Sequence, residues 1–151
     1  RESDGAELAV SGIDLDDVEP FPQNKPESSR ESRIEILKGD ICDPEMQQKI
    51  SQLAGGKVHT VLSDMSPKLT GIRFRDIARS SELVEMGAWV ASQMLLPGGS
   101  FVAKTFPGNE SDVIFQSVRK TYKQFSRHVL KSSRKTSTEY YFVGRGFSGV
   151  E

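Results

Sequence analysis

Short apolar segments alternate with helical patterns along the chain, and several of the apolar segments run directly into a charged residue. The clearest case is "VHTVLSDMSPKLTG", residues 58–71, in which an apolar strand pattern ends at Asp64 before a loop that contains Pro67 and Gly71. Alternating strand and helix patterns predict an α/β fold with a mostly parallel sheet. Ligands of such sheets bind beyond the carboxyl ends of the strands, so Asp64 is a candidate site residue.

The periodicities and turn residues predict the individual elements. Pro44 suits the first position of a helix that Gly55-Gly56 stops, and Pro97-Gly98-Gly99 is expected to end a second helix. Two closely spaced strands at the end of the chain predict an antiparallel edge strand. We expect strands at 7–15, 34–37, 58–64, 100–106, 125–131 and 139–146, helices at 44–54, 80–96 and 110–124, and an exposed loop at 16–33, within one domain over 1–151.

Composition narrows the function classes. The net charge of −1 predicts no polyanion partner by itself, but residues 119–135 contain basic residues and no acid, and they could face phosphates or form a solvated helix face. A single cysteine, Cys42, excludes an internal disulfide, and with two histidines no zinc-like spacing exists, so no metal is expected. No apolar run approaches the roughly 18 residues of a membrane span. A cytoplasmic or equivalent location is therefore the expectation.

Four polar residues follow or end separate strand patterns, namely Asp14, Asp40, Asp64 and Lys104. They would meet at one edge if the sheet is parallel. For a lone aspartate after a strand, a turn or helix cap is the commoner role. Lys104 interrupts an apolar row in "FVAKTF"; it could guard an edge strand, or it could be a general base with a pKa lowered by desolvation. An adjacent carboxylate would orient this lysine but raise its pKa.

A nucleoside cofactor suits these acids. Gly55-Gly56 and Pro97-Gly98-Gly99 precede strands, so no Gly-rich loop for a pyrophosphate is visible. Carboxylates favour a positively charged, phosphate-free nucleoside, and S-adenosylmethionine is the candidate. The Asp14 carboxylate could accept hydrogen bonds from ribose hydroxyls, and the Asp40 carboxylate could accept one from an adenine amino group.

Three blocks, "SDMSPKLTG", "PGGSFVAKTFPG" and "SSRKTSTEYYFVG", resemble in order and spacing the FtsJ-type ribosomal RNA 2′-O-methyltransferases (large-subunit methyltransferase E), over roughly residues 7–147. The resemblance implies a class I, Rossmann-like S-adenosylmethionine-dependent methyltransferase fold with helices on both faces of the sheet. It also implies methylation of a ribose 2′-hydroxyl, with uridine expected, in large-subunit ribosomal RNA. The expected partner is the large ribosomal subunit, and the expected state is a monomer.

The resemblance assigns roles by motif. It implies that Lys104 takes the proton of the 2′-hydroxyl, that Asp64 orients this lysine beside the methyl donor, and that Glu139 supports the lysine or the ribose. Asp14, Asp40, Ile41 and Asp64 are the implied cofactor-binding residues. The candidate RNA-binding residues are Lys68, Arg73, Arg75, Arg134, Lys135 and Tyr141.

The family's first strand, Gly-rich cofactor loop and first catalytic lysine have no counterpart after Arg1, so we expect a fragment that lacks them. Two alternatives stay open: a non-catalytic RNA- or nucleoside-binding module, and a nicotinamide-dependent enzyme whose fingerprint lies upstream. The Asp-Met-Ser-Pro sequence argues against base-modifying amino methyltransferases, which carry an Asn/Asp-Pro-Pro-aromatic motif at this strand end.

Overall fold

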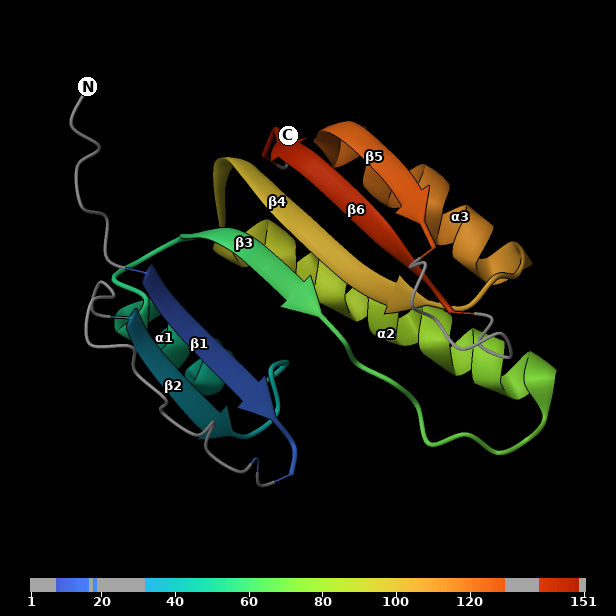
Figure 1. Cartoon of the computed structure of the whole chain (residues 1–151), viewed down its shortest axis with the longest axis horizontal. Coiled ribbons are helices and arrows are strands. Elements are labelled where there is room, and N and C mark those ends of the chain that lie inside the picture. Colours follow the sequence, from blue (N-terminus) through green and yellow to red (C-terminus); the bar gives the residue numbers. More distant parts are fainter. Residues whose placement is uncertain (1–7, 17, 19–31, 130–138, 150–151) are drawn as a thin grey trace. The chain divides into compact units, whose positions relative to one another are not determined.

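The structure is a computed structural model that describes residues 8–16, 18, 32–129 and 139–149. The chain forms two compact units, residues 1–56 and residues 57–151 (Figure 1). Among the described residues, no helix combines the length and the apolar character that crossing a membrane requires.

The first unit contains a parallel strand pair and one helix. Strands β1 (Leu8–Asp14) and β2 (Ser32–Lys38) pair in register from Leu8 opposite Ser32 to Asp14 opposite Lys38, so both end at the same edge. Helix α1 (Pro44–Leu53) begins after Asp43, whose carboxylate accepts the backbone N–H of Glu45 at 3.0 Å. The helix ends next to Gly55, at φ 71°, as the sequence predicted.

The second unit is a four-stranded sheet with two helices. The strand order is β3-β4-β6-β5; β3 and β4 are parallel, and β6 is antiparallel to both β4 and β5. The elements are β3 (Val58–Ser63), α2 (Arg73–Met94), β4 (Leu95–Thr105), α3 (Asn109–Val118), a 3₁₀ turn (Arg119–Thr121), β5 (Tyr122–His128) and β6 (Tyr140–Phe147).

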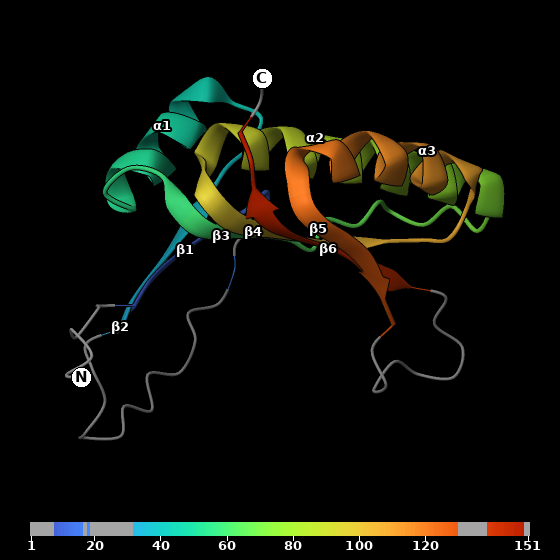
Figure 2. The ribbon, with the colours of Figure 1, turned by 90° about the horizontal axis from the view of Figure 1, so that it is seen from above.

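The α/β class is confirmed, and the last two strands form the antiparallel edge of the sheet that the sequence predicted. Of these two strands, β5 is the outermost and β6 lies between β4 and β5. This internal place suits β6 because it carries apolar or aromatic residues on both faces, Phe142 on one and Val143 on the other. Helices on both faces were also predicted, but in the described part of this unit α2 and α3 cover the same face (Figure 2).

Helix α2 begins at Arg73, seven residues before the predicted start at residue 80. The cause is Asp76 in its first turn, whose carboxylate accepts the backbone N–H groups of Thr70 at 2.8 Å and Gly71 at 3.1 Å. These bonds fold the preceding loop back onto the helix, and no hydrophobic pattern in residues 73–79 indicates this start. An acid in the first turn also interacts favourably with the helix dipole.

The Pro97-Gly98-Gly99 segment does not end α2 but lies within β4, where the pairing with β3 shifts between Val58 and Thr60. Gly98 has φ 84°, a conformation that favours glycine in such a bulge. The helix predicted over 110–124 ends at Val118 in α3, and Tyr122 begins β5, where it is buried.

The core of the second unit lies between the sheet and its helices. Along β4, Phe101, Ala103 and Thr105 are fully buried, whereas Val102 and Lys104 point to the opposite face and are half-buried. Lys104 therefore lies on the sheet face away from α2 and α3. The buried cluster comprises Val84, Ala91, Leu95, Phe101, Ala103, Tyr122, Tyr140, Phe142 and Phe147.

Phe142 is expected to contribute most to this core, because its ring is fully buried and packs against Phe115 and Tyr140 at centroid distances of 5.3 and 5.6 Å. Replacing Phe142 with alanine should lower the free energy of unfolding by about 3–5 kcal/mol, measured by urea denaturation. The control is Leu62→Ala, which removes a side chain that is 74% exposed. It should change the free energy of unfolding by less than about 0.5 kcal/mol. Equal urea midpoints for the two variants would contradict this assignment of the core.

Candidate active site

The parallel pairing of β3 with β4 brings Asp64 and Lys104 together. The last paired residues are Ser63 and Ala103, so the next residue of each strand lies beside the other. Lys104 Nζ is 2.9 Å from Asp64 Oδ1; the side chain of the lysine is 14% exposed and that of the aspartate 79%. Asp64 thus forms an ion pair with a residue of the neighbouring strand. It is not the cap of α2, since Ile72 occupies that N-cap position. Its carboxylate remains accessible to a ligand.

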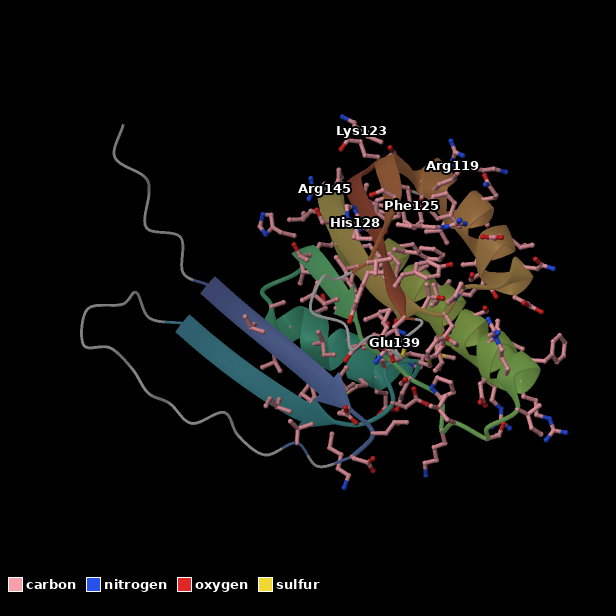
Figure 3. All side chains as sticks on the ribbon, turned by 45° about the vertical axis from the view of Figure 1, so that its right-hand side comes forward. Arg119, Lys123, Phe125, His128, Glu139 and Arg145 are labelled. Atoms are coloured by element: carbon pink, nitrogen blue, oxygen red, sulfur yellow. The ribbon has the colours of Figure 1, made fainter. Side chains whose placement is uncertain are left out.

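Glu139 and Tyr141 lie at the same edge of this sheet. Because β6 is antiparallel to β4, it begins where β4 ends, and Tyr141 pairs with Lys104 in the register. Glu139 precedes β6 and is half-buried. Figure 3 shows Glu139 at the opposite end of the sheet from Lys123 and Arg145. The predicted set of Asp64, Lys104 and Glu139 is therefore gathered at one edge.

The charges around Lys104 decide its protonation. Burial alone lowers the pKa of Lys104, but the hydrogen bond and charge of Asp64, with the charges of Glu139 and Tyr141, outweigh it and raise the pKa above its ordinary value. Lys104 is therefore an ammonium ion at neutral pH in this structure. As a base it would first have to lose a proton, which requires a change in its surroundings.

The predicted cofactor residues of the first unit occupy turns after β1 and β2. Asp14 is exposed, and its Oδ1 accepts the backbone N–H of Asp16 at 3.0 Å; Asp40 is exposed, and its Oδ1 accepts that of Cys42 at 2.9 Å. Each carboxylate thus uses one oxygen in a turn, the commoner role of such residues, and is accessible to a donor from a ligand. Ile41 is half-buried.

The predicted RNA-binding residues divide into two groups. Lys68, Arg73 and Arg75 are exposed around the start of α2, and Tyr141 is half-buried beside Lys104. Arg134 and Lys135 lie outside the described residues. Among the residues that the structure describes, no cluster of three or more His, Cys, Asp or Glu side chains could hold a metal ion.

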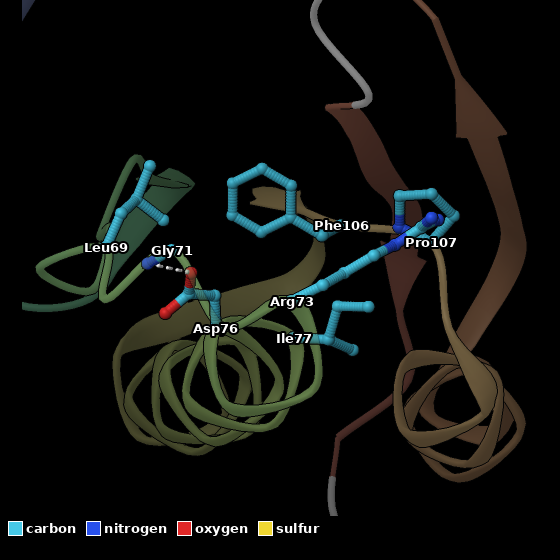
Figure 4. Close-up of a pocket in the computed structure, with 7 residues that line it drawn as sticks. All are labelled: Leu69, Gly71, Arg73, Asp76, Ile77, Phe106 and Pro107. Atoms are coloured by element: carbon cyan, nitrogen blue, oxygen red, sulfur yellow. Dashed lines mark hydrogen bonds between the residues drawn. The ribbon is translucent and has the colours of Figure 1, made fainter.

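Sequence reasoning missed a cavity of about 230 Å³ in the second unit (Figure 4). Phe106 could have been noticed, because it shares a face with Lys104 in the strand predicted over 100–106, although β4 ends one residue before it. Leu69 and Gly71 come from a loop whose course no periodicity predicts. Three others lie in the first turns of α2, before the predicted start of that helix. The lining residues are Leu69, Gly71, Arg73, Asp76, Ile77, Phe106 and Pro107.

Replacing Asp64 with asparagine should lower the pKa of Lys104, because the variant removes the charge and the ionic hydrogen bond that raise it. NMR titration of the lysine side-chain resonances measures this pKa. Asp112→Asn, which removes the partner of Arg127, is the matched control and should leave it unchanged. An unchanged Lys104 pKa in Asp64→Asn would contradict the pairing.

The same pair predicts a small pH dependence of stability. Since the folded-state pKa of Lys104 is raised, the stabilisation is complete below the pKa of an unfolded lysine, about 10.4, and is lost as the pH rises through the higher folded value. Because Asp64 is exposed, the ion pair contributes about 1 kcal/mol or less to the free energy of unfolding.

Comparisons with known proteins identify the family of the chain. A family model described as FtsJ-like methyltransferase matches residues 3–147. Proteins named ribosomal RNA large subunit methyltransferase E are similar to the chain: that of Methanobrevibacter smithii is 37% identical over 95% of this chain and 64% of its own length, and that of Syntrophobacter fumaroxidans is 39% identical over 95% and 68%. The chain thus spans about two thirds of the length of such relatives.

Solved structures show the same fold. A Plasmodium falciparum protein named as a ribosomal RNA methyltransferase superposes with a TM-score of 0.74 at 19% identity, covering 93% of this chain and 73% of that one. An alphavirus protein termed P23pro-zbd gives a TM-score of 0.60 at 15% identity, covering 95% of this chain and 21% of that one. With the family model matched from residue 3 to residue 147, the chain belongs to the FtsJ-like methyltransferase family.

Proposed function

We propose that this chain forms the catalytic part of an RNA 2′-O-ribose methyltransferase that uses S-adenosylmethionine. The observation that supports this most is the Lys104–Asp64 pair at the carboxyl ends of two parallel strands. The names of the relatives favour large-subunit ribosomal RNA as the substrate, with a uridine ribose as the expected target. The large ribosomal subunit would then be the partner of a monomeric enzyme, in the cytoplasm or, in a eukaryote, in an organellar matrix.

In this proposal Lys104 accepts the proton of the 2′-hydroxyl, and Asp64 holds the lysine side chain in place. S-adenosylmethionine supplies an electrophilic methyl group on a sulfonium, whose positive charge lowers the pKa of a neighbouring ammonium. This effect opposes the raised pKa of Lys104 in the structure. Glu139 orients the ribose or the lysine from the start of β6. Holding the hydroxyl in line contributes up to about 7–11 kcal/mol to the lowering of the barrier.

The remaining predicted residues bind the two substrates. Asp14 and Asp40 accept hydrogen bonds from the ribose hydroxyls and the adenine amino group of the cofactor, and Ile41 contacts its apolar surface. Carboxylates fit this cationic nucleoside better than they fit a phosphate. For the RNA, phosphates would contact the basic side chains and a base would stack on the aromatic ring. These RNA-binding residues are Lys68, Arg73, Arg75, Arg134, Lys135 and Tyr141.

A second candidate is a non-catalytic RNA-binding module. The ion pair of Lys104 with Asp64 at 2.9 Å favours it, because it stabilises the ammonium form, which suits a phosphate better than it suits proton abstraction. The two candidates differ in one property, which is turnover.

Lys104→Ala should lower methyl transfer by about 10²–10⁴-fold, the usual contribution of a general base. The assay measures labelled methyl transferred from S-adenosylmethionine to the ribose of large ribosomal subunits from an unmethylated strain, by the full-length protein. Lys123→Ala, which removes an exposed lysine at the other end of the sheet, should retain activity.

If the Lys104→Ala variant still transfers labelled methyl to the ribose, the proposed reaction stands but the role of this lysine as the base is refuted. No label on subunits, on free ribosomal RNA or on transfer RNA would refute the enzyme and leave the binding module.

A further inference from the structure

The cavity beside α2 is lined by Phe106 and Pro107, which directly follow the strand that carries Lys104. Phe106 follows Lys104 by two residues, so their Cα atoms are at most about 7 Å apart. Figure 4 shows Leu69 and Phe106 across from one another, with the Asp76–Gly71 hydrogen bond between them, and the Arg73 side chain extended toward Pro107. An RNA strand that places a ribose at Lys104 could therefore reach this cavity with the base of that nucleotide or of its neighbour.

The wall formed by Asp76 is held in place by hydrogen bonds. Asp76 Oδ1 accepts the backbone N–H and the hydroxyl of Thr70, both at 2.8 Å, and Oδ2 accepts the N–H of Gly71 at 3.1 Å. The backbone hydrogen bond from Thr70 is the main cause of the lowered pKa of Asp76, so this carboxylate is ionised at neutral pH. A carboxylate offers about four acceptor positions, and these three bonds leave one on Oδ2.

This lining favours a neutral, planar ring as the ligand. The ring of Phe106 offers a stacking face, Leu69 and Ile77 add apolar surface, and Asp76 can accept an N–H from the edge of a heterocycle. The charges of Asp76 and Arg73, which both line the cavity, offset one another, and this suits a neutral ring better than an anion. The volume, about 230 Å³, is below the roughly 300–1,000 Å³ of sites for drug-sized ligands and suits a single base.

We propose that this cavity holds a nucleobase of the RNA substrate, either that of the methylated nucleotide or that of its neighbour, and so determines which ribose reaches Lys104. The inference rests on the proposed function, because it assumes an RNA strand at this edge of the sheet. Phe106 is then a stacking platform, and Asp76 selects bases that present an N–H group.

The test compares two aromatic residues in the same region. Phe106→Ala should weaken the binding of single-stranded RNA oligonucleotides to the full-length protein by about 5- to 150-fold, the range of one lost base stack. Phe106→Tyr, which keeps a stacking ring, should restore binding. The matched control is Phe74→Ala, because Phe74 is 72% exposed but does not line the cavity; its affinity should stay within twofold of the wild type. Fluorescence anisotropy at fixed salt measures the dissociation constants.

An abasic scan then identifies the bound base. Bases are removed from the oligonucleotide one at a time, and at one position the removal should weaken wild-type binding by a similar factor. Removing that same base should not weaken the binding of Phe106→Ala any further, because the base and the Phe106 ring form a single contact. The amide NMR signals of Thr70 and Gly71 report whether the variant keeps the folded loop, and they should shift with intact RNA but not with that abasic RNA.

The outcomes separate this inference from the proposed function. If the affinity loss from removing a base adds to the loss from Phe106→Ala at every position, the base pocket is refuted even if the protein methylates RNA. A shared loss at one position without methyl transfer would support the pocket and refute the enzyme. A wild-type protein that binds no RNA would refute both.

Discussion

Strand β4 has two chemically different faces, and the placement of the functional side chains depends on this difference. Phe101, Ala103 and Thr105 are fully buried against the helices, so strand alternation forces Lys104 to the other face. A lysine that is only 14% exposed needs a charged partner, because an unpaired buried ammonium is costly. The parallel neighbour β3 supplies this partner in Asp64, so the contact that satisfies the lysine also lies at the centre of the candidate site.

This pairing has a chemical consequence. The contacts that keep Lys104 in position also raise its pKa, so the arrangement is well oriented for proton transfer but protonated. A positive charge next to the lysine would offset the carboxylates, so in the proposed function a cationic methyl donor would assist proton transfer as well as alkylation. The loop after Asp64 extends the site further, since Asp76 holds it against the start of α2 and so shapes one wall of the cavity.

Much of the candidate site could be predicted from the sequence. Asp64 and Lys104 were identified because strand ends and period-two alternation are local patterns, and the rule that parallel strands end at one edge predicted their meeting. Asp14 and Asp40 were located at strand ends for the same reason. The internal place of β6 was not predicted, because strand order depends on which edges bury the most apolar surface. The cavity was missed because hydrogen bonds to Asp76 determine the course of its loop.

The sequence by itself determined the α/β class, the positions of most elements, the family and the residues at the strand ends, because these follow from short-range periodicity, turn chemistry and motif order. Only the tertiary structure decided the strand order, the face on which the helices pack and the protonation of Lys104. The physical reason is distance along the chain. Asp64, Lys104 and Glu139 are far apart in sequence, and the pKa of the lysine depends on charges and burial that exist only once three strands have paired.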